Sequence, residues 1–240
     1  MSKRNLKVEK NSLSKFLDSI SRINESCIVE VKDGVLSAIT ASADNTLLLY
    51  GEITNVESNY NSSLNLPDIK KLNRVVESIP TDKPEFTLEN NNIQYSGSGL
   101  KFKYHLYDDG FLTKPPINIE KIKSFEYDVV FTLTKDNVNS LIKSSVFATD
   151  SNKMYLFTED GKLKCELTDR AKHNTDAITL DLCDVDFVLS PIPLNLENIK
   201  AINMIDSEVK FNVNTKFGVM IIDIIKDAIK LKYIITSLTQ

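Results

Sequence analysis

The stretch EVKDGVLSAIT, from Glu30 to Thr40, places an Asp-Gly pair between two runs of alternating apolar and polar residues. Such a pair favours a tight two-residue hairpin, because both turn residues must adopt positive φ. A second stretch, FTEDGKLKCELT from Phe157 to Thr168, has the same arrangement. Gly34 and Gly161 lie 127 positions apart. The sequence therefore predicts one hairpin twice, and the flanking segments show whether more of the chain repeats.

Segments with helical periodicity flank both hairpins in the same order. Upstream are KNSLSKFLDSISRI and KDNVNSLIKSSV, for which Asn11 and Asp136 are the predicted N-caps. Downstream are NLPDIKKLNRVVESI and NLENIKAINMI, and the closing strands KFKYHLYD and KLKYIITS also correspond. The offsets between matched elements stay between 125 and 130 residues. This period is longer than that of solenoid repeats and predicts two copies of a compact domain.

Each predicted copy contains many consecutive strands and only two helices. This order favours an α+β fold, with antiparallel sheets and helices on one face. We expect two compact domains at residues 1–108 and 127–240, joined by a connector at residues 109–126. Pro115 and Pro116 favour an extended crossing in this connector. A connector of this length is often functional.

Composition restricts the class of protein. The 240 residues are 42% hydrophobic and 26% charged, as in soluble globular proteins. No apolar run approaches the ~20 residues of a membrane span, and the start lacks a secretory pattern, so we expect a cytoplasmic protein with no membrane partner. Cys27, Cys165 and Cys183 lack metal-ligand spacing, which favours buried reduced thiols and predicts neither metal nor cofactor. A net charge of −4 still permits a local basic face.

The duplicated order resembles the sliding clamps of DNA replication. The resemblance rests on SLSKFLDSISRI with DGVLSAIT, on FTLTKDNVNSLIKSS with EDGKLKCELTD, and on the closing LKYIIT. It is strongest toward clamps of T-even-type bacteriophages and more distant toward proliferating cell nuclear antigen. The resemblance implies a homotrimeric ring, with helices inside and sheets outside, that encircles duplex DNA. It further implies a viral processivity factor in the host cytoplasm, without enzymatic activity, that a clamp loader ATPase places on DNA and that tethers the polymerase. Transcription factors are a further candidate class of partner.

A clamp must hold the DNA backbone without reading its sequence, and Lys and Arg side chains make such contacts. Seven basic residues lie on the polar faces of the predicted helices and are the expected DNA-facing set: Lys15, Arg22, Lys70, Lys71, Arg74, Lys143 and Lys200. Acidic residues share these helices, so the local excess of positive charge is modest. A solvated helical face is the alternative interpretation of the same pattern.

By the same resemblance, residues Lys101–Asp108 of one subunit pair with Thr175–Leu182 of the next. The expected interface residues are Phe102, Tyr104, Leu106, Ile178, Leu180 and Leu182. Their alternation fits internal strands equally well. A partner peptide from the polymerase or loader is expected in an apolar pocket beneath the connector. The pocket residues would be Ile39, Leu47, Ile117, Ile119, Ile235 and Leu238.

Two other functions remain as alternatives. Asp181, Asp184 and Asp186 in DLCDVD could hold magnesium in a nuclease-like enzyme, although a solvated turn explains them more simply. A protein scaffold with this fold that does not bind DNA is the second alternative. His105 and His173 have no partners at catalytic spacing, and no nucleophile elbow or phosphate loop is present.

Overall fold

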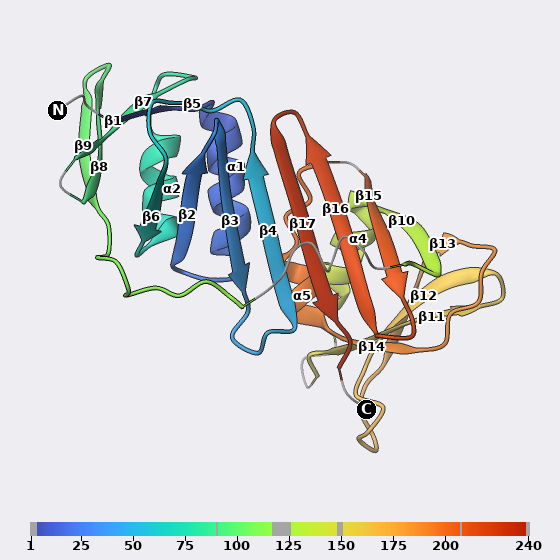
Figure 1. Ribbon diagram of the computed structural model, residues 1–240. Helices are drawn as coiled ribbons and strands as arrows, with labels where there is room; N and C mark the ends of the chain where they lie inside the picture. Colours follow the sequence, from blue (N-terminus) through green and yellow to red (C-terminus); the bar gives the residue numbers. More distant parts are fainter. Residues whose placement is uncertain (1–3, 90, 117–125, 148–150, 207, 239–240) are drawn as a thin grey trace. The chain divides into compact units, whose positions relative to one another are not determined.

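The computed structural model describes residues 4–89, 91–116, 126–147, 151–206 and 208–238. The chain is rich in β-sheet with few helices, as predicted for the α+β class (Figure 1). It divides into two compact units. Unit 1 comprises Met1–Ser42, Leu48–Ile117 and Ile225–Lys232, and unit 2 comprises Ala43–Leu47, Asn118–Ile224 and Tyr233–Gln240.

The described part of unit 1 combines two sheets with two helices. Its elements are β1 (Arg4–Lys7), α1 (Lys10–Ser21), β2 (Cys27–Lys32), β3 (Val35–Ala41), most of β4 (Leu47–Ile53), β5 (Glu57–Ser58), β6 (Ser62–Leu66), α2 (Ile69–Glu77), β7 (Glu85–Glu89), β8 (Asn92–Gly97) and β9 (Leu100–His105). One sheet has the order β5-β1-β7-β8-β9, and β4-β3-β2-β6 follow one another in the other. Strand β9 is therefore at the end of its sheet.

Unit 2 repeats this plan. Its elements are β10 (Val129–Thr134), α4 (Lys135–Ser144), β11 (Lys153–Glu159), β12 (Lys162–Leu167), β13 (Ile178–Asp184), β14 (Ile192–Asn195), α5 (Leu196–Ala201), β15 (Glu208–Asn214), and most of β16 (Val219–Lys226). Strand β17 (Ile229–Thr236) is divided between the units at Lys232. The strand orders are β13-β12-β11-β14 and β10-β15-β16-β17, so β13 also ends a sheet.

Both predicted hairpins are confirmed. The β2–β3 turn is closed by Lys32 opposite Val35, and the β11–β12 turn by Glu159 opposite Lys162. The turn residues all have positive φ: Asp33 (50°), Gly34 (77°), Asp160 (52°) and Gly161 (72°). These angles are those of a type I′ turn, whose twist matches that of the flanking strands.

The surroundings of the two turns repeat as well. The backbone N–H of Val56 donates to the carbonyl of Gly34 (3.0 Å), and that of Val185 donates to the carbonyl of Gly161 (2.9 Å). Each turn is thus tied by its glycine carbonyl to a chain segment well downstream. The repeat therefore extends to tertiary hydrogen bonds and is not limited to local turn chemistry.

The four predicted helices are present, but two predicted caps were wrong. Glu9, not Asn11, is the N-cap of α1. Thr134, not Asp136, caps α4 in a capping box with Asn137. The Thr134 and Asn137 side chains each accept from the other's backbone N–H, which satisfies two donors where an Asp136 cap would satisfy one.

Helix α1 packs closely on the strands beside it. Phe16 is fully buried, and a Cβ added to Gly51 on β4 would lie 3.0 Å from its ring. Glycine at position 51 therefore lets the helix approach the sheet. The three cysteines are free thiols, and burial raises the pKa of Cys27 and of Cys165 to about 12. Among the described residues, no helix is long and apolar enough to cross a bilayer.

Candidate nucleic-acid interface and sheet edges

Helices α1 and α2 pack side by side in unit 1 and cover one face of its β2–β3 sheet (Figure 1). The Ser14 hydroxyl of α1 donates to the Glu77 carboxylate of α2 (3.0 Å), and Lys10 Nζ donates to the Ile79 carbonyl (2.9 Å). These bonds fix the two helices relative to each other. Their remaining faces are available to solvent.

The solvent face of α2 is mainly basic. Lys70, Lys71 and Arg74 are exposed, and none of them forms an ion pair within the described part of the chain. The single acid of the helix, Glu77, accepts bonds from Ser14 and from Asn73 (3.2 Å). Three unpaired cations on one helical face form a surface suited to phosphates.

The N-cap of α2 is Asp68, whose carboxylate accepts from the backbone N–H of Lys71 (2.9 Å). Ile69, Leu72 and Val76 bury the opposite face of the helix. Cap and burial together fix which side chains of α2 point outward. The positions of the three cations are thus set by the helix, not by contacts of their own.

Helix α1 has fewer unpaired, exposed cations than α2. Lys15 is half-buried, and Arg22, at the C-cap, is exposed but bonded to Asp18 (3.1 Å). Such an exposed pair is weak, so Arg22 could exchange this partner for a phosphate.

The helices of unit 2 carry fewer available cations. Lys143 is exposed on α4, whereas Lys200 on the six-residue α5 is bonded to Glu197 (2.8 Å). Exposed Lys135, in the first turn of α4, is a cation that the sequence reasoning missed. It could have been predicted from the sequence if Thr134 had been recognised as the N-cap, because Lys135 is the first residue of the helix. The basic helical surface is thus concentrated on unit 1.

Strand β9 carries the first predicted interface set. It ends at His105 and not at Asp108. The Leu106 N–H still donates to the Asn91 carbonyl beside β8 (3.0 Å), whereas the Tyr107 N–H donates to the Asn65 carbonyl (2.9 Å). Leu106 is half-buried at this point. The chain leaves the sheet here and enters the connector.

Tyr104 joins β9 to the start of α2. Its hydroxyl donates to the Asp68 carbonyl (2.7 Å) and accepts from the Asp68 N–H (2.9 Å). Burial raises the pKa of Tyr104 to about 12. Phe102, half-buried, stacks on Tyr95 with ring centroids 5.9 Å apart. The apolar side of β9 therefore packs inward.

Strand β13 carries the second set, in which Ile178 and Leu180 are half-buried and Leu182 is buried. The strand begins at Ile178, later than the predicted Thr175. A register shift opposite Leu163 and Lys164 marks a bulge in this strand. The Leu182 carbonyl at the bulge accepts from Asn137 of α4 (2.8 Å).

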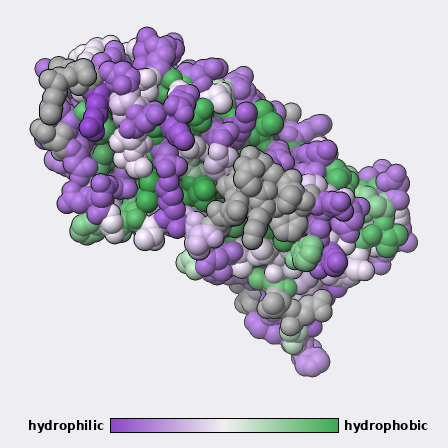
Figure 2. Space-filling view, in the orientation of Figure 1, coloured by the Kyte–Doolittle hydropathy of each residue, from purple (hydrophilic) through white to green (hydrophobic). Residues whose placement is uncertain are grey.

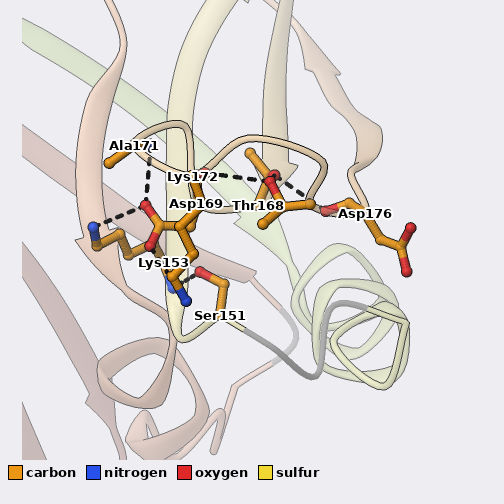
Figure 3. Close-up of polar contacts among 8 residues, drawn as sticks. Ser151, Lys153, Thr168, Asp169, Ala171, Lys172 and Asp176 are labelled. Carbon is orange, nitrogen blue, oxygen red and sulfur yellow. Dashed lines mark hydrogen bonds and ion pairs between the residues drawn. The ribbon is translucent and has the colours of Figure 1, made fainter.

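The loop that leads into β13 is held by polar contacts (Figure 3). Asp169, 6% exposed, accepts from Lys153 Nζ (2.9 Å) and from the N–H of Ala171 (3.2 Å). The Thr168 hydroxyl donates to the Asp176 carbonyl (3.1 Å). The hydrogen bond from Lys153 lowers the pKa of Asp169. These contacts fix the entry into the edge strand.

The predicted pocket residues differ in accessibility. Ile117 and Ile119 lie outside the described residues. Ile39 on β3 is half-buried, as is Leu238, whose N–H donates to the Pro193 carbonyl (2.9 Å). Leu47 (1% exposed) and Ile235 (0%) are core residues of unit 2. The last two offer almost no surface to a peptide in this conformation.

The DLCDVD acids do not form a metal site. The Asp181 carboxylate accepts from Lys162 Nζ (2.8 Å), and this bond lowers its pKa. Asp184 and Asp186 are exposed. No three His, Cys, Asp or Glu side chains of the described chain are placed to hold a metal ion. The nuclease alternative is therefore not favoured.

Comparisons with known proteins give matches in structure only. No protein-family model matches, and no curated protein matches. A proliferating cell nuclear antigen from Entamoeba histolytica superposes with a TM-score of 0.77 at 12% identity, over 99% of both chains. A. fulgidus PCNA, in a structure with the C-terminal region of FEN-1 bound, gives a TM-score of 0.73 at 12% identity, again over 99% of both chains. A DNA polymerase sliding clamp from Pseudomonas aeruginosa gives 0.74 at 14% identity, over 98% of this chain and 67% of that one.

These likenesses establish the fold. The chain has the fold of the DNA sliding clamps, which confirms the predicted fold class. They extend to both PCNA and bacterial clamps. The closer resemblance to T-even-type bacteriophage clamps stays a prediction.

Proposed function

We propose that this chain is a sliding clamp, three copies of which close into a ring around duplex DNA and tether a replicative polymerase. The observation that carries the proposal is the exposed, unpaired set Lys70, Lys71 and Arg74, presented by a capped helix within a clamp fold. The contacts would be to phosphates, which hold DNA without fixing a position along it. The protein would act by enclosure and not by catalysis.

Ring closure is supported by two of the open sheet edges. Strand β9 ends one sheet of unit 1, and strand β13 ends one sheet of unit 2. An end strand has unpaired backbone groups on one side, which a second chain can bind. A join between unlike edges is head-to-tail and must either close into a ring or continue as a polymer.

The remaining parts of the proposal follow the clamp resemblance. The domains would be residues 1–108 and 127–240, with residues 109–126 crossing between them. A polymerase or clamp-loader peptide would dock near this connector, and Ile39 and Leu238 are the half-buried members of the pocket set. By the same resemblance, the chain would be a bacteriophage clamp acting in the host cytoplasm.

The first test is the mass of the purified protein. We expect light scattering to give three times the 27.1 kDa of one chain. A stable monomer at tens of micromolar protein would contradict a closed ring.

The second test reverses charge on α2. The variant K70E/K71E/R74E should lose most of its stimulation of processive synthesis on a primed circular template, because three phosphate contacts become repulsions. Its trimer mass should not change, because these side chains make no ion pair in the described structure. A protein scaffold without a DNA role would leave processivity equal with and without the wild-type protein.

A matched control is K32E/K210E/K230E. These lysines are exposed on strands β2, β15 and β17, and the change in net charge is the same. Figure 2 shows that hydrophilic residues predominate on the strand side of unit 1 turned to the viewer. Equal loss of processivity in this variant would assign the effect to total charge and would contradict a DNA-facing α2.

A further inference from the structure

Helix α2 carries one acid on its otherwise basic solvent face. Lys70, Arg74 and Glu77 follow one another at spacings of four and three residues, so their side chains lie along one stripe of the helix. All three are exposed. Within the described ranges, Glu77 forms no ion pair with either cation or with any other base. A negative charge therefore stands within the surface that we assign to phosphates.

Neutral donors hold the Glu77 carboxylate in place. The Ser14 hydroxyl of α1 (3.0 Å) and the Asn73 side-chain amide (3.2 Å) both donate to its Oε1 atom. A hydroxyl and an amide orient a carboxylate without neutralising it. The acid of α1 differs, because Asp18 is paired with the guanidinium of Arg22 (3.1 Å). Of the two acids on this helix pair, Glu77 is thus the one that is fixed but not neutralised.

The position of Glu77 does not favour the helix itself. Glu77 is the last residue of α2, and an acid is unfavourable beside the negative C-terminal end of a helix. Asn73 is 9% exposed, and its own Oδ1 atom has no hydrogen-bond partner among the described residues. A buried acceptor without a partner costs stability. A glutamine at position 77 would accept the same two bonds, so the contact between the helices does not require a charge.

We propose that Glu77 limits how tightly the clamp holds duplex DNA. This inference rests on the proposed function. An anchored carboxylate beside Lys70 and Arg74 repels the phosphates that these cations attract, and at physiological salt its field extends about 8 Å. Phosphate contacts that are individually weak let a protein move along the duplex. In a ring, the same repulsion acts from each of three subunits. Glu77 is therefore a residue that sets the affinity for DNA.

The test is E77Q, which removes the charge and keeps an acceptor for Ser14 and Asn73. Fluorescence anisotropy of a short linear duplex, onto which a ring can thread from a free end, measures the affinity. The E77Q trimer should bind about eightfold more tightly than the wild type at low salt, because one exposed charge interaction is worth roughly twofold in each subunit. Its affinity should also fall more steeply as salt is added. Unchanged affinity in a folded E77Q trimer would overturn the inference.

Three further variants separate charge from packing. E77A removes the charge together with both bonds and should tighten binding as E77Q does. S14A removes one bond to Glu77 but keeps the charge, so it should leave the affinity unchanged. E208Q removes an exposed acid of β15, with the same change in net charge as E77Q, and should also have no effect. Tightening by S14A equal to that of E77Q would assign the effect to helix packing, and equal tightening by E208Q would assign it to total charge; either result would overturn the inference.

The outcomes distinguish this inference from the proposed function. A wild-type trimer that does not bind the duplex, or a K70E/K71E/R74E trimer that binds it as tightly as the wild type, would overturn the DNA-facing role of α2 and this inference with it. If the triple variant loses binding while E77Q and E77A bind like the wild type, only the role of Glu77 is overturned. Light scattering and urea unfolding verify that each variant keeps its trimer and its fold.

Discussion

Helix α1 of unit 1 and helix α4 of unit 2 occupy equivalent places in the repeat but are packed differently. Helix α1 buries Leu13, Phe16, Leu17 and Ile20. At the corresponding positions of α4, Val138 and Leu141 are buried, Ile142 is half-buried, and Ser145 replaces Ile20. Helix α1 also packs against the nine-residue α2, whereas the second helix of unit 2 has six residues.

The difference indicates which features a duplicated domain must keep. The two hairpin turns agree in φ, register and tertiary hydrogen bond, because a type I′ turn tolerates few residues. The helices agree only in position, because a half-buried helix needs an apolar stripe and not a particular set of side chains. The first helix of unit 1 is therefore more deeply buried than α4, and the helices of unit 1 also carry more exposed cations.

The largest effect should come from the helix cores. Leu17→Ala should lower the free energy of unfolding by about 2–5 kcal/mol, because it leaves a cavity at a site that is 1% exposed. Ile142→Ala, at the equivalent half-buried site, should cost about 1 kcal/mol. Urea unfolding followed by circular dichroism measures both. Equal costs would show that the two helices are packed alike.

A smaller effect should distinguish the two turns. Gly34→Ala and Gly161→Ala both force alanine into the left-handed region, at a cost of about 1–2 kcal/mol. At Gly34 the added Cβ would also lie 3.3 Å from the Val56 carbonyl oxygen, whereas at Gly161 nothing lies within 4 Å. The Gly34 variant should therefore be the less stable in thermal unfolding. The reverse order would mean that the Val56 segment moves away freely.

The third effect should appear only at alkaline pH. Burial raises the pKa of Cys27 from 9.0 to about 12, so the unfolded chain loses this proton first. The stability that the neutral thiol contributes is complete below pH 9 and is lost as the pH rises toward 12, by up to about 1.4 kcal/mol per pH unit.

The two units should differ in how much stability they lose as the pH rises. Cys165 of unit 2 behaves like Cys27, and burial also raises the pKa values of Cys183 and Tyr127 in that unit. Unit 1 contains in addition Tyr60 and Tyr104, whose pKa values burial raises from 10.0 to about 12. Hydrogen exchange between pH 9 and 11 should therefore show unit 1 losing protection more steeply. Cys27→Ala should flatten its profile, and an unchanged profile would contradict the assignment.

Much of the fold could be predicted from the sequence, and the failures have physical causes. The β2–β3 and β11–β12 hairpins were predicted, because β2 and β11 each alternate up to an Asp-Gly turn. Strands β5, β6 and β14 were missed, since they are short and lack clear alternation. The caps were misplaced because Asn11 and Asp136 are cap-forming residues located two residues too far along, within the first turn of each helix.

The candidate site was predicted less completely. Lys70, Lys71 and Arg74 could be found because helical periodicity alone places them opposite Ile69, Leu72 and Val76. The sequence could not predict that Leu47 and Ile235 are inaccessible, because their burial depends on strands that are distant in the sequence. The link from Tyr104 to Asp68 spans 36 residues and likewise has no local signal.

The sequence by itself determined the turns, the helical faces and the duplication, because these depend on the φ preferences of a few residues and on the spacing of apolar ones. Only the tertiary structure decided that β9 and β13 end their sheets. An end strand and an internal strand can have the same alternation. They differ in whether a neighbour satisfies the second row of backbone hydrogen bonds, and that neighbour is chosen by the packing of the whole unit.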